Sequence, residues 1–257
     1  MEYNRVLEYF TDQAKRGIWD TLYDTDNPLS HSFIHRYRKS IKLINYKNNK
    51  SILDMGCGTG ILVSYALENN LKYFGMDNSK EMLDFIEESY TNEIKSKKVN
   101  LLLSDFQNFN DLNNFDIFFG IGFIEYFEDP FVQIKKILNF LNNDRQLILS
   151  FPNTNSLDNL MLKIFYYPKK IIRNIFSKKT HQPPRTMFTV KEILKFAEIN
   201  NNFKIKIVNY NTNIFTYPFT RFIPRFSNFI GNYLEDSFLN KFSFFSSGFI
   251  VLFEKKY

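Results

Sequence analysis

Three glycines at alternate positions follow a short apolar run, with an acid two residues before the first. The stretch reads Ile52-Leu53-Asp54-Met55-Gly56-Cys57-Gly58-Thr59-Gly60. Glycines allow a ligand to approach the backbone without a Cβ clash. The spacing is not the G-x-G-x-x-G of dinucleotide sites, since position 61 is Ile, and no phosphate-binding Gly-Lys-Ser/Thr follows. Asp54 disfavours a pyrophosphate and favours a cationic, amino-bearing ligand.

Two further acids follow apolar runs. Asp77 ends the run Phe74-Gly75-Met76, and Asp105 lies between Ser104 and Phe106. The two oxygens of a carboxylate can accept hydrogen bonds from a pair of hydroxyl groups. Any one such acid could instead cap a helix. Three of them in order, each at the end of an expected strand, favour a ligand-binding edge of a sheet.

The elements that position these residues alternate along the chain. Apolar runs predict strands at 51–54, 71–76, 99–104, 115–119, 146–151, 204–210 and 248–253. Amphipathic runs predict helices at 61–69, 79–90, 130–141 and 190–199, with Ser79 as an N-cap and Pro130 in a first turn. The alternation predicts an α/β fold with a doubly wound, seven-stranded, mostly parallel sheet.

Three segments lie outside this alternation, and we expect all of them to belong to one domain, 1–257. Residues 1–49 are expected to form a helical cap on a ligand-binding core, 50–155. Residues 156–188 are basic, with apolar residues at helical spacing from Leu160 to Ile175. They predict a lid over the site, or a helix lying on an anionic membrane. The aromatic segment 212–246 predicts an acceptor pocket lined by Phe215, Tyr217, Phe219, Phe222, Phe226 and Phe229, or else sheet packing or a dimer contact.

Composition narrows the class of protein. The chain has 257 residues, 44% of them apolar, and a net charge of +6. Its single cysteine, Cys57, excludes an internal disulfide and a cysteine-based zinc site. The longest apolar run, 117–124, is far shorter than the roughly 20 residues of a membrane helix, and residues 1–10 do not resemble a secretory signal. We expect a cytoplasmic protein, with peripheral membrane contact as an open alternative.

Together these motifs make residues 50–155 resemble the class I S-adenosylmethionine-dependent methyltransferases. The resemblance implies a Rossmann-like methyltransferase fold with S-adenosyl-L-methionine as cofactor. In that family the acid matching Asp77 binds the ribose hydroxyls, and the stretch matching Ser104 to Phe106 holds the adenine. The cofactor-binding residues that it implies are Arg36, Asp54, Gly56, Cys57, Gly58, Gly60, Asp77, Asn78, Met82, Ser104, Asp105, Phe106, Gly120 and Ile121.

The N-terminal segment resembles a subset of this family. There, Phe10 with Trp19-Asp20 and Tyr23 would cover the methionine end of the cofactor. Arg36 would bind the cofactor carboxylate, a task that suits a guanidinium; the alternative is a solvated helix face shared with Arg38 and Lys39. Cys57 is expected to be a small packing residue and not a nucleophile.

The catalytic residues are less clearly marked. Many relatives carry Glu-His after the fourth strand, where this chain has Glu125-Tyr126. Our candidates are Tyr126 and His181, which lies on the basic insertion; His31 and His35 are alternatives, or helix-surface residues. The insertion also resembles that of the ubiquinone-biosynthesis O-methyltransferases. Because Gly122 and Tyr126 stand where those enzymes hold a divalent metal, we expect no metal.

The sequence therefore predicts an enzyme that methylates a small-molecule or lipid-like acceptor. We expect the methyl group to be transferred to an oxygen atom of that acceptor. A nucleic-acid methyltransferase is the first alternative, but Gly120-Ile121-Gly122-Phe123 replaces the Asn/Asp-Pro-Pro-aromatic motif, so we expect no nucleic-acid partner. A non-catalytic cofactor-binding protein is the second. The oligomeric state is left open.

Overall fold

A single mixed sheet organises the chain in the computed structural model, which describes residues 2–18, 31–45, 51–166, 183 and 185–256. The strand order is β3-β2-β1-β4-β5-β7-β6. The strands are β1 (Ser51–Met55), β2 (Lys72–Asp77), β3 (Val99–Leu103), β4 (Ile117–Gly120), β5 (Gln146–Pro152), β6 (Phe203–Thr212) and β7 (Ser246–Lys255). The first five pair in parallel, whereas β7 is antiparallel to both β5 and β6. The predicted seven-stranded, mostly parallel sheet is confirmed.

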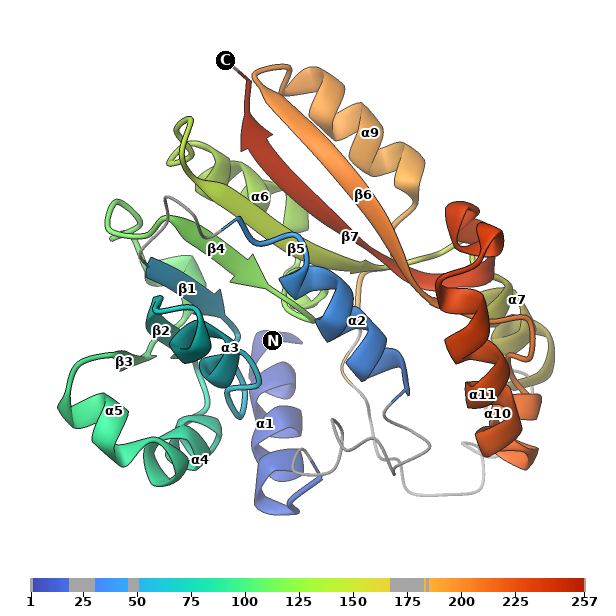
Figure 1. Cartoon of the computed structure of the whole chain (residues 1–257), viewed down its shortest axis with the longest axis horizontal. Helices are drawn as coiled ribbons and strands as arrows, with labels where there is room; N and C mark the ends of the chain where they lie inside the picture. Colours follow the sequence, from blue (N-terminus) through green and yellow to red (C-terminus); the bar gives the residue numbers. More distant parts are fainter. Residues whose placement is uncertain (1, 19–30, 46–50, 167–182, 184, 257) are drawn as a thin grey trace.

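Helices cover both faces of the sheet (Figure 1). They are α1 (Glu2–Lys15), α2 (His31–Ile41), α3 (Val63–Glu68), α4 (Lys80–Ser89), α5 (Thr91–Lys95), α6 (Pro130–Leu138), α7 (Leu157–Met161), α9 (Val190–Ile199), α10 (Phe219–Phe222) and α11 (Pro224–Glu235). Short helical turns are η2 (Phe106–Asn108), η3 (Ile124–Tyr126), η4 (Leu162–Tyr166), η5 (Phe238–Lys241) and η6 (Ser243–Phe245).

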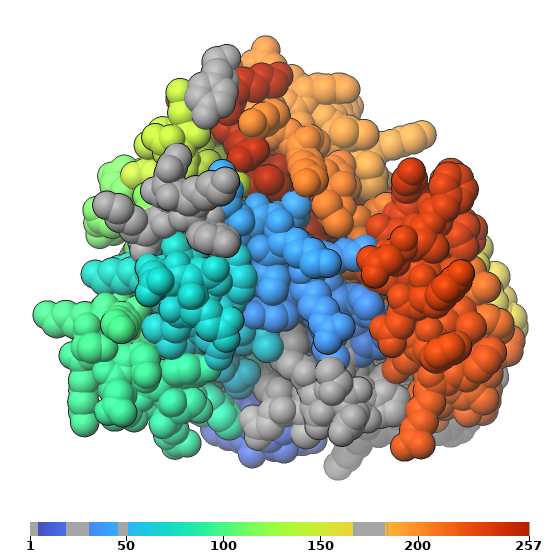
Figure 2. Space-filling view, in the orientation of Figure 1, coloured from blue at the N-terminus to red at the C-terminus, as the bar shows by residue number. Residues whose placement is uncertain are grey.

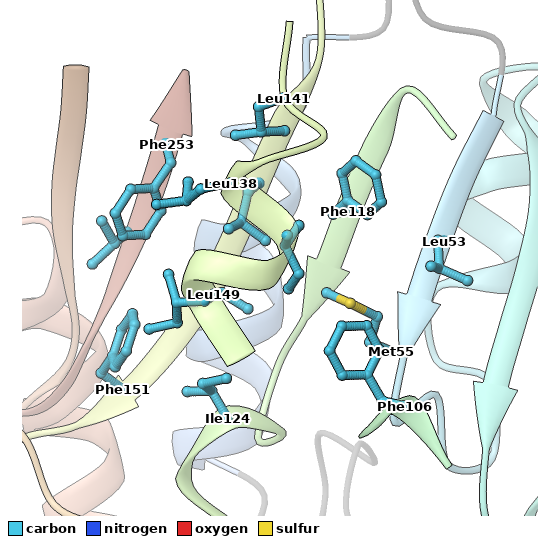
Figure 3. Close-up of a cluster of buried hydrophobic side chains, with 14 of the residues drawn as sticks. Leu53, Met55, Phe106, Phe118, Ile124, Leu138, Leu141, Leu149, Phe151 and Phe253 are labelled. Atoms are coloured by element: carbon cyan, nitrogen blue, oxygen red, sulfur yellow. The ribbon is translucent and has the colours of Figure 1, made fainter. Parts of the chain in front are cut away.

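Alternation along the strands divides the core into two clusters. On β1, Leu53 and Met55 belong to the cluster beneath α6 and α9, whereas Ile52 belongs to the cluster beneath α2, α3 and α4. Successive side chains of a strand point to opposite faces, so a sheet covered on both sides needs apolar residues at every position. All five residues of β1 and all seven of β5 are buried accordingly. Figure 3 shows the first cluster, with Leu138 and Leu141 packed over Phe118 and Leu149.

Local signals set the helix ends near the site. The Ser79 hydroxyl accepts a hydrogen bond from the backbone N–H of Met82 and begins α4, as predicted. Pro130 occupies the first turn of α6, where its missing N–H costs nothing. Thr189 and Glu192 form a capping box at the start of α9. These caps fix where each strand gives way to its helix, and so fix the edge of the sheet that carries the acids.

The two N-terminal helices pack on different parts of this frame. Helix α1 contacts α4, and α2 contacts β6 and β7. His31 and His35 are both buried on α2, where they hydrogen-bond the side-chain oxygens of Asn211 (2.9 Å) and Asn232 (2.7 Å). Of the two alternatives for these histidines, the one that places them on a helix surface is therefore wrong.

Candidate functional site

A cavity of about 750 Å³ opens at the carboxyl ends of the central strands. Strands β1 and β4 are neighbours there, with β2 and β3 continuing on one side and β5 on the other. This is the point where the strand order reverses, and open α/β sheets bind ligands in the crevice at such a point. The wall combines the glycine-rich turn after β1, the ends of β2 and β3, and residues of α1, α2 and α7.

The glycines of the turn after β1 differ in their surroundings. Gly56, Gly58 and Gly60 all have positive φ, from +53° to +82°, a region that L-residues with side chains rarely adopt. A Cβ on Gly56 or Gly60 would come within 2.8 Å of Phe123 or Ile86, whereas a Cβ on Gly58 would meet nothing within 4 Å. Gly58 lines the cavity, so its missing side chain leaves room that a ligand could occupy.

Asp77 ends β2 and holds the glycine-rich turn. Its two carboxylate oxygens accept hydrogen bonds from the backbone N–H groups of Gly58 (3.0 Å) and Ser79 (2.9 Å). Each oxygen keeps a second lone pair for a ligand hydroxyl. Burial raises the pKa of Asp77, although hydrogen bonds from the backbone amides of Ser79, Gly58 and Asn78 oppose that shift.

Asp54 lies deeper in the same wall. The side chain is buried and accepts a hydrogen bond from the hydroxyl of Tyr73 at 2.9 Å. Burial raises the pKa of Asp54 to about 7, and the Tyr73 hydrogen bond opposes this. A cation beside Asp54 would restore its ionised form, which is the behaviour expected for a site that receives an amino group.

The end of β3 adds a carboxylate and an aromatic wall. Asp105 caps the turn η2 by accepting from the backbone N–H of Gln107 at 2.9 Å. The Phe106 ring is buried and meets the ring of Phe123 edge-on, with centroids 5.4 Å apart. Both residues line the cavity, so an acid acceptor and an apolar surface lie together where a flat heterocycle with an amino group could bind.

Arg36 reaches the cavity from α2. Its guanidinium packs over Gly122, where a Cβ would lie 3.0 Å from Nη1, and over the ring of Phe33, 5.1 Å away. Gly122 is itself held by its N–H, which donates to the Ser150 hydroxyl at 2.8 Å. Arg36 therefore brings a fixed positive charge to the end of the cavity beside Glu125.

Glu125, on the turn η3 after β4, is a buried acid in this wall. Among the described residues its Oε2 atom has no hydrogen-bond partner. Burial raises its pKa, while the charges of Arg36 and Arg185 oppose the shift. A buried carboxylate of this kind can accept a proton or a hydrogen bond from a bound molecule.

Tyr126 follows Glu125 and also lines the cavity, with its ring edge-on to Phe10 at 5.1 Å. Burial raises the pKa of its hydroxyl well above the ordinary value. Tyr126 is therefore a neutral phenol near pH 7, able to exchange hydrogen bonds but unsuited to remove a proton.

The two described ends of the basic insertion, 156–188, form the other side of the cavity. Ser156, Asp158, Asn159 and Leu162 line the cavity before the undescribed stretch, and Pro183, Arg185 and Met187 line it afterwards. The N–H of Thr186 donates to the backbone oxygen of Glu125 at 2.7 Å, which brings Arg185 next to η3. Burial raises the pKa of Asp158, and Arg185 opposes the shift.

Most of the predicted cofactor residues come together. The cavity wall includes Arg36, Asp54, Gly56, Cys57, Gly58, Asp77, Asn78, Met82, Ser104, Asp105, Phe106 and Ile121. Gly60 and Gly120 are not in the wall; a Cβ there would lie 2.8 Å from Ile86 and 2.9 Å from Leu149, respectively. Burial raises the pKa of the Cys57 thiol, so it stays protonated. His181, Trp19, Asp20 and Tyr23 lie outside the described residues.

The aromatic segment 212–246 does not supply the wall. None of the six predicted aromatic residues lines this cavity, and the acceptor pocket expected there stays a prediction. Glu125, Asp158, Asn159 and Arg185 were missed instead. Glu125 could have been found as a lone acid just after the fourth strand. The other three come together because residues 186–188 return beside β5 and η3.

Two features are absent from the part of the chain that the structure describes. No group of three or more His, Cys, Asp or Glu residues in it is placed to hold a metal ion. No helix in it is long and apolar enough to cross a membrane.

Comparison with known proteins agrees with this geometry. Residues 53–149 match the model of the methyltransferase domain family. The chain is also 30% identical over 105 residues to (S)-coclaurine N-methyltransferase of Papaver somniferum, a match that covers 40% of this chain and 30% of that protein. The chain thus spans less than a third of the length of the curated relatives that it matches.

Solved structures show the same fold across the whole chain. Magnesium protoporphyrin IX methyltransferase from Synechocystis, with bound S-adenosylhomocysteine, superposes with a TM-score of 0.64 at 15% identity, covering 99% of this chain and 100% of that one. The plantazolicin methyltransferase, also with S-adenosylhomocysteine, superposes with a TM-score of 0.58 at 18% identity, covering 100% and 96%. The likeness in fold thus extends beyond residues 53–149 to the rest of the chain.

Proposed function

We propose that this protein transfers a methyl group from S-adenosylmethionine to a small-molecule or lipid-like acceptor. One observation carries the proposal: a single cavity joins the acids of the β1–β3 edge to a second polar group around Glu125. The acids of the β1–β3 edge suit an amino-bearing nucleoside. The polar group around Glu125 suits the acceptor that reacts with it. The resemblance to the ubiquinone-biosynthesis O-methyltransferases extends the same proposal to a quinone-like acceptor.

The chain offers matching groups for each part of the cofactor. Asp77 can accept from the ribose hydroxyls, Asp105 and Phe106 can hold the adenine, and Arg36 can bind the carboxylate. The open space at Gly58 and the buried Asp54 fit a nucleoside that carries an amino group. When bound, S-adenosylmethionine supplies an activated methyl group on a sulfonium. The protein then needs chiefly to align the acceptor and exclude water.

Glu125 is the residue that we assign to proton transfer. Its Oε2 faces no protein donor among the described residues, and its raised pKa makes it a stronger base than an ordinary glutamate. An oxygen nucleophile needs such a base, and oxygen is the acceptor atom that we propose first. Nitrogen is the second candidate, because the matched relatives are N-methyltransferases and the acids Glu125 and Asp158 would attract an amine.

The remaining predictions are kept as parts of this proposal. They are a single domain with a helical cap (1–49), a cofactor-binding core (50–155) and insertions at 156–188 and 212–246, catalytic contributions from Tyr126 and His181, metal independence, and a cytoplasmic location with peripheral membrane contact. The described ends of the 156–188 insertion support its role beside the acceptor, since both line the cavity.

The test is transfer of labelled methyl from S-adenosylmethionine to a panel of hydroxyl and amine acceptors. Wild-type protein should label an acceptor, and Glu125→Gln should lower kcat at least tenfold while affinity for S-adenosylhomocysteine stays the same. Turnover should survive exhaustive chelation. Labelling of RNA or DNA, or cofactor binding without any transfer, would favour one of the two alternatives.

A further inference from the structure

The C-terminal segment exposes an unusual number of aromatic rings. Seven side chains on α10, α11, η5 and the residue that follows it are each 43–77% exposed: Phe219, Phe222, Phe226, Phe229, Tyr233, Phe238 and Phe242. We call these residues the aromatic surface. Helix α11 contacts both α10 and η5, and together they form the orange-red flank of the molecule in Figure 2. Scattered exposed rings are ordinary, but a contiguous group marks an interaction site.

Helix α11 is held so that its aromatic residues must point outward. Phe226, Phe229 and Tyr233 recur at helical spacing, while the buried residues of the helix are Ser227, Gly231, Leu234 and Glu235. A surface helix normally buries its apolar face instead. Helix α11 buries Leu234 but leaves its three aromatic rings exposed, so a local explanation is needed.

The buried side of α11 supplies that explanation. A Cβ on Gly231 would lie 2.7 Å from the ring of His31, so the helix packs closely on α2. Glu235 is 2% exposed, pairs with Lys39 at 3.1 Å and accepts from the backbone N–H of Thr212 at 2.6 Å. If α11 turned to bury its rings, this carboxylate would lose these partners, and an unpaired buried charge is strongly destabilising. The rings therefore stay available to a partner.

The charges around the aromatic surface select the kind of partner. Arg221, Arg225 and Lys241 are exposed, and Lys241 lies over the Phe238 ring at 5.8 Å. Asp236 is the one exposed acid of residues 212–246. Aromatic rings beside exposed cations suit the interface of an anionic membrane. A two-fold contact with a second copy would bring the same cations together, which disfavours a dimer.

We propose that the aromatic surface binds anionic membrane surfaces, with its rings at the headgroup boundary. The surface also lies near the cavity: the Tyr217 ring before α10 meets Tyr166 of η4 edge-on at 5.7 Å, and Leu162 of η4 lines the cavity. Membrane binding would thus bring this wall of the cavity close to a lipid-like acceptor; this last step alone rests on the proposed function.

The test is sedimentation of the full chain with vesicles of phosphatidylcholine, with and without phosphatidylserine. Wild type should bind the mixed vesicles, and added salt should weaken binding. Phe229→Ser with Tyr233→Ser should weaken it at least tenfold. Arg221→Gln with Arg225→Gln should weaken it by about fivefold per arginine. The matched control is Val132→Ser with Ile199→Ser, two apolar residues that are 56% and 73% exposed on α6 and α9; it should bind like wild type.

All variants should keep wild-type affinity for S-adenosylhomocysteine, a separate measurement that tests the proposed function. The membrane proposal is overturned if wild type ignores the mixed vesicles, or if the Phe229/Tyr233 variant binds them as well as wild type does. It is also overturned if ultracentrifugation shows a dimer that this variant dissociates and vesicle binding is absent. That result would assign the surface to a second copy of the chain.

Discussion

Asp54 and Asp77 end neighbouring strands, and both are buried acids whose pKa the protein raises. Their hydrogen bonds come from within the domain: Tyr73 donates to Asp54, and two backbone amides donate to Asp77. Each acid keeps acceptor capacity for a ligand. At the scale of single residues, the account thus depends on what these two carboxylates do when a nucleoside binds.

Replacing Asp77 tests the ribose assignment. Asp77→Asn keeps the shape of the side chain but removes one charged acceptor oxygen, so affinity for S-adenosylhomocysteine should fall at least tenfold. This follows from about 1.5–3 kcal/mol for each hydrogen bond to a charged group. The measurement is isothermal titration calorimetry. Asp84→Asn, a partly exposed acid on α4, is the control and should bind normally. If Asp77→Asn binds S-adenosylhomocysteine as tightly as wild type does, the ribose assignment is contradicted.

The pH dependence of binding tests Asp54. An amino cation prefers the ionised carboxylate, and below the pKa of about 7 most of the protein must first lose that proton. Affinity for S-adenosylhomocysteine should therefore rise about tenfold per unit from pH 5 and level off above pH 7. The folding stability of the ligand-free protein has the opposite pH dependence. Its unfolded Asp54 ionises near pH 4 while the folded one retains its proton, so this group lowers stability as pH rises from about 4 to 7.

Two variants isolate Asp54 in that profile. Asp54→Asn should remove the break near pH 7. Tyr73→Phe should move the break to higher pH, because it removes a hydrogen bond that favours the ionised carboxylate. A break that persists unchanged in Asp54→Asn would assign the titration to another group.

The site residues differ in how far the sequence predicts them. Asp54, Asp77 and Asp105 could be placed because each ends a strand of a parallel sheet, where ends meet at one edge. Asp158 and Arg185 could not, since they meet across an insertion whose path is set by tertiary contacts such as Thr186 to Glu125. The histidines were misjudged because their partners, Asn211 and Asn232, lie about 180 or more residues away.

At the scale of elements, two glycines of the turn after β1 have different roles: Gly60 matters chiefly for stability and Gly58 chiefly for ligand binding. A side chain at either Gly58 or Gly60 adopts a left-handed backbone at a cost of about 1–2 kcal/mol. Gly60→Ala also clashes with Ile86 at 2.8 Å, so it should lower thermal stability more than Gly58→Ala does. Gly58→Ala should instead show the larger loss of affinity for S-adenosylhomocysteine beyond its effect on stability, because its methyl group enters the cavity. Equal losses of both properties in the two variants would contradict this division.

The predicted strands match the structure closely because buried parallel strands are nearly continuous apolar runs. Helices α10 and α11 were not predicted, for two physical reasons. Pro224 suggests a break, yet it occupies the first turn of α11, where proline is tolerated. The aromatic residues of α11 also lie on its exposed side, so their spacing does not indicate burial against the sheet.

At the scale of the whole molecule, the cavity draws on the N-terminal helices, the sheet edge and the insertion together. A ligand that contacts all of them should stabilise the folded state as a unit. S-adenosylhomocysteine at 100 times its Kd should add about 2.7 kcal/mol, or roughly 5–10 °C in Tm for a chain of this size. NAD should give no shift, since the glycine spacing does not fit a dinucleotide. A larger shift with NAD would contradict the cofactor assignment.

The most direct test of the central claim is a crystal structure of the protein with S-adenosylhomocysteine. We predict the nucleoside in the cavity between the β1 turn and the end of β3, its ribose hydroxyls on Asp77, its adenine beside Asp105 and Phe106, and its amino acid end toward Arg36. The sulfur should face the Glu125 end of the cavity. A complex in which the ligand binds elsewhere, or leaves Asp77 without a contact, would contradict the account.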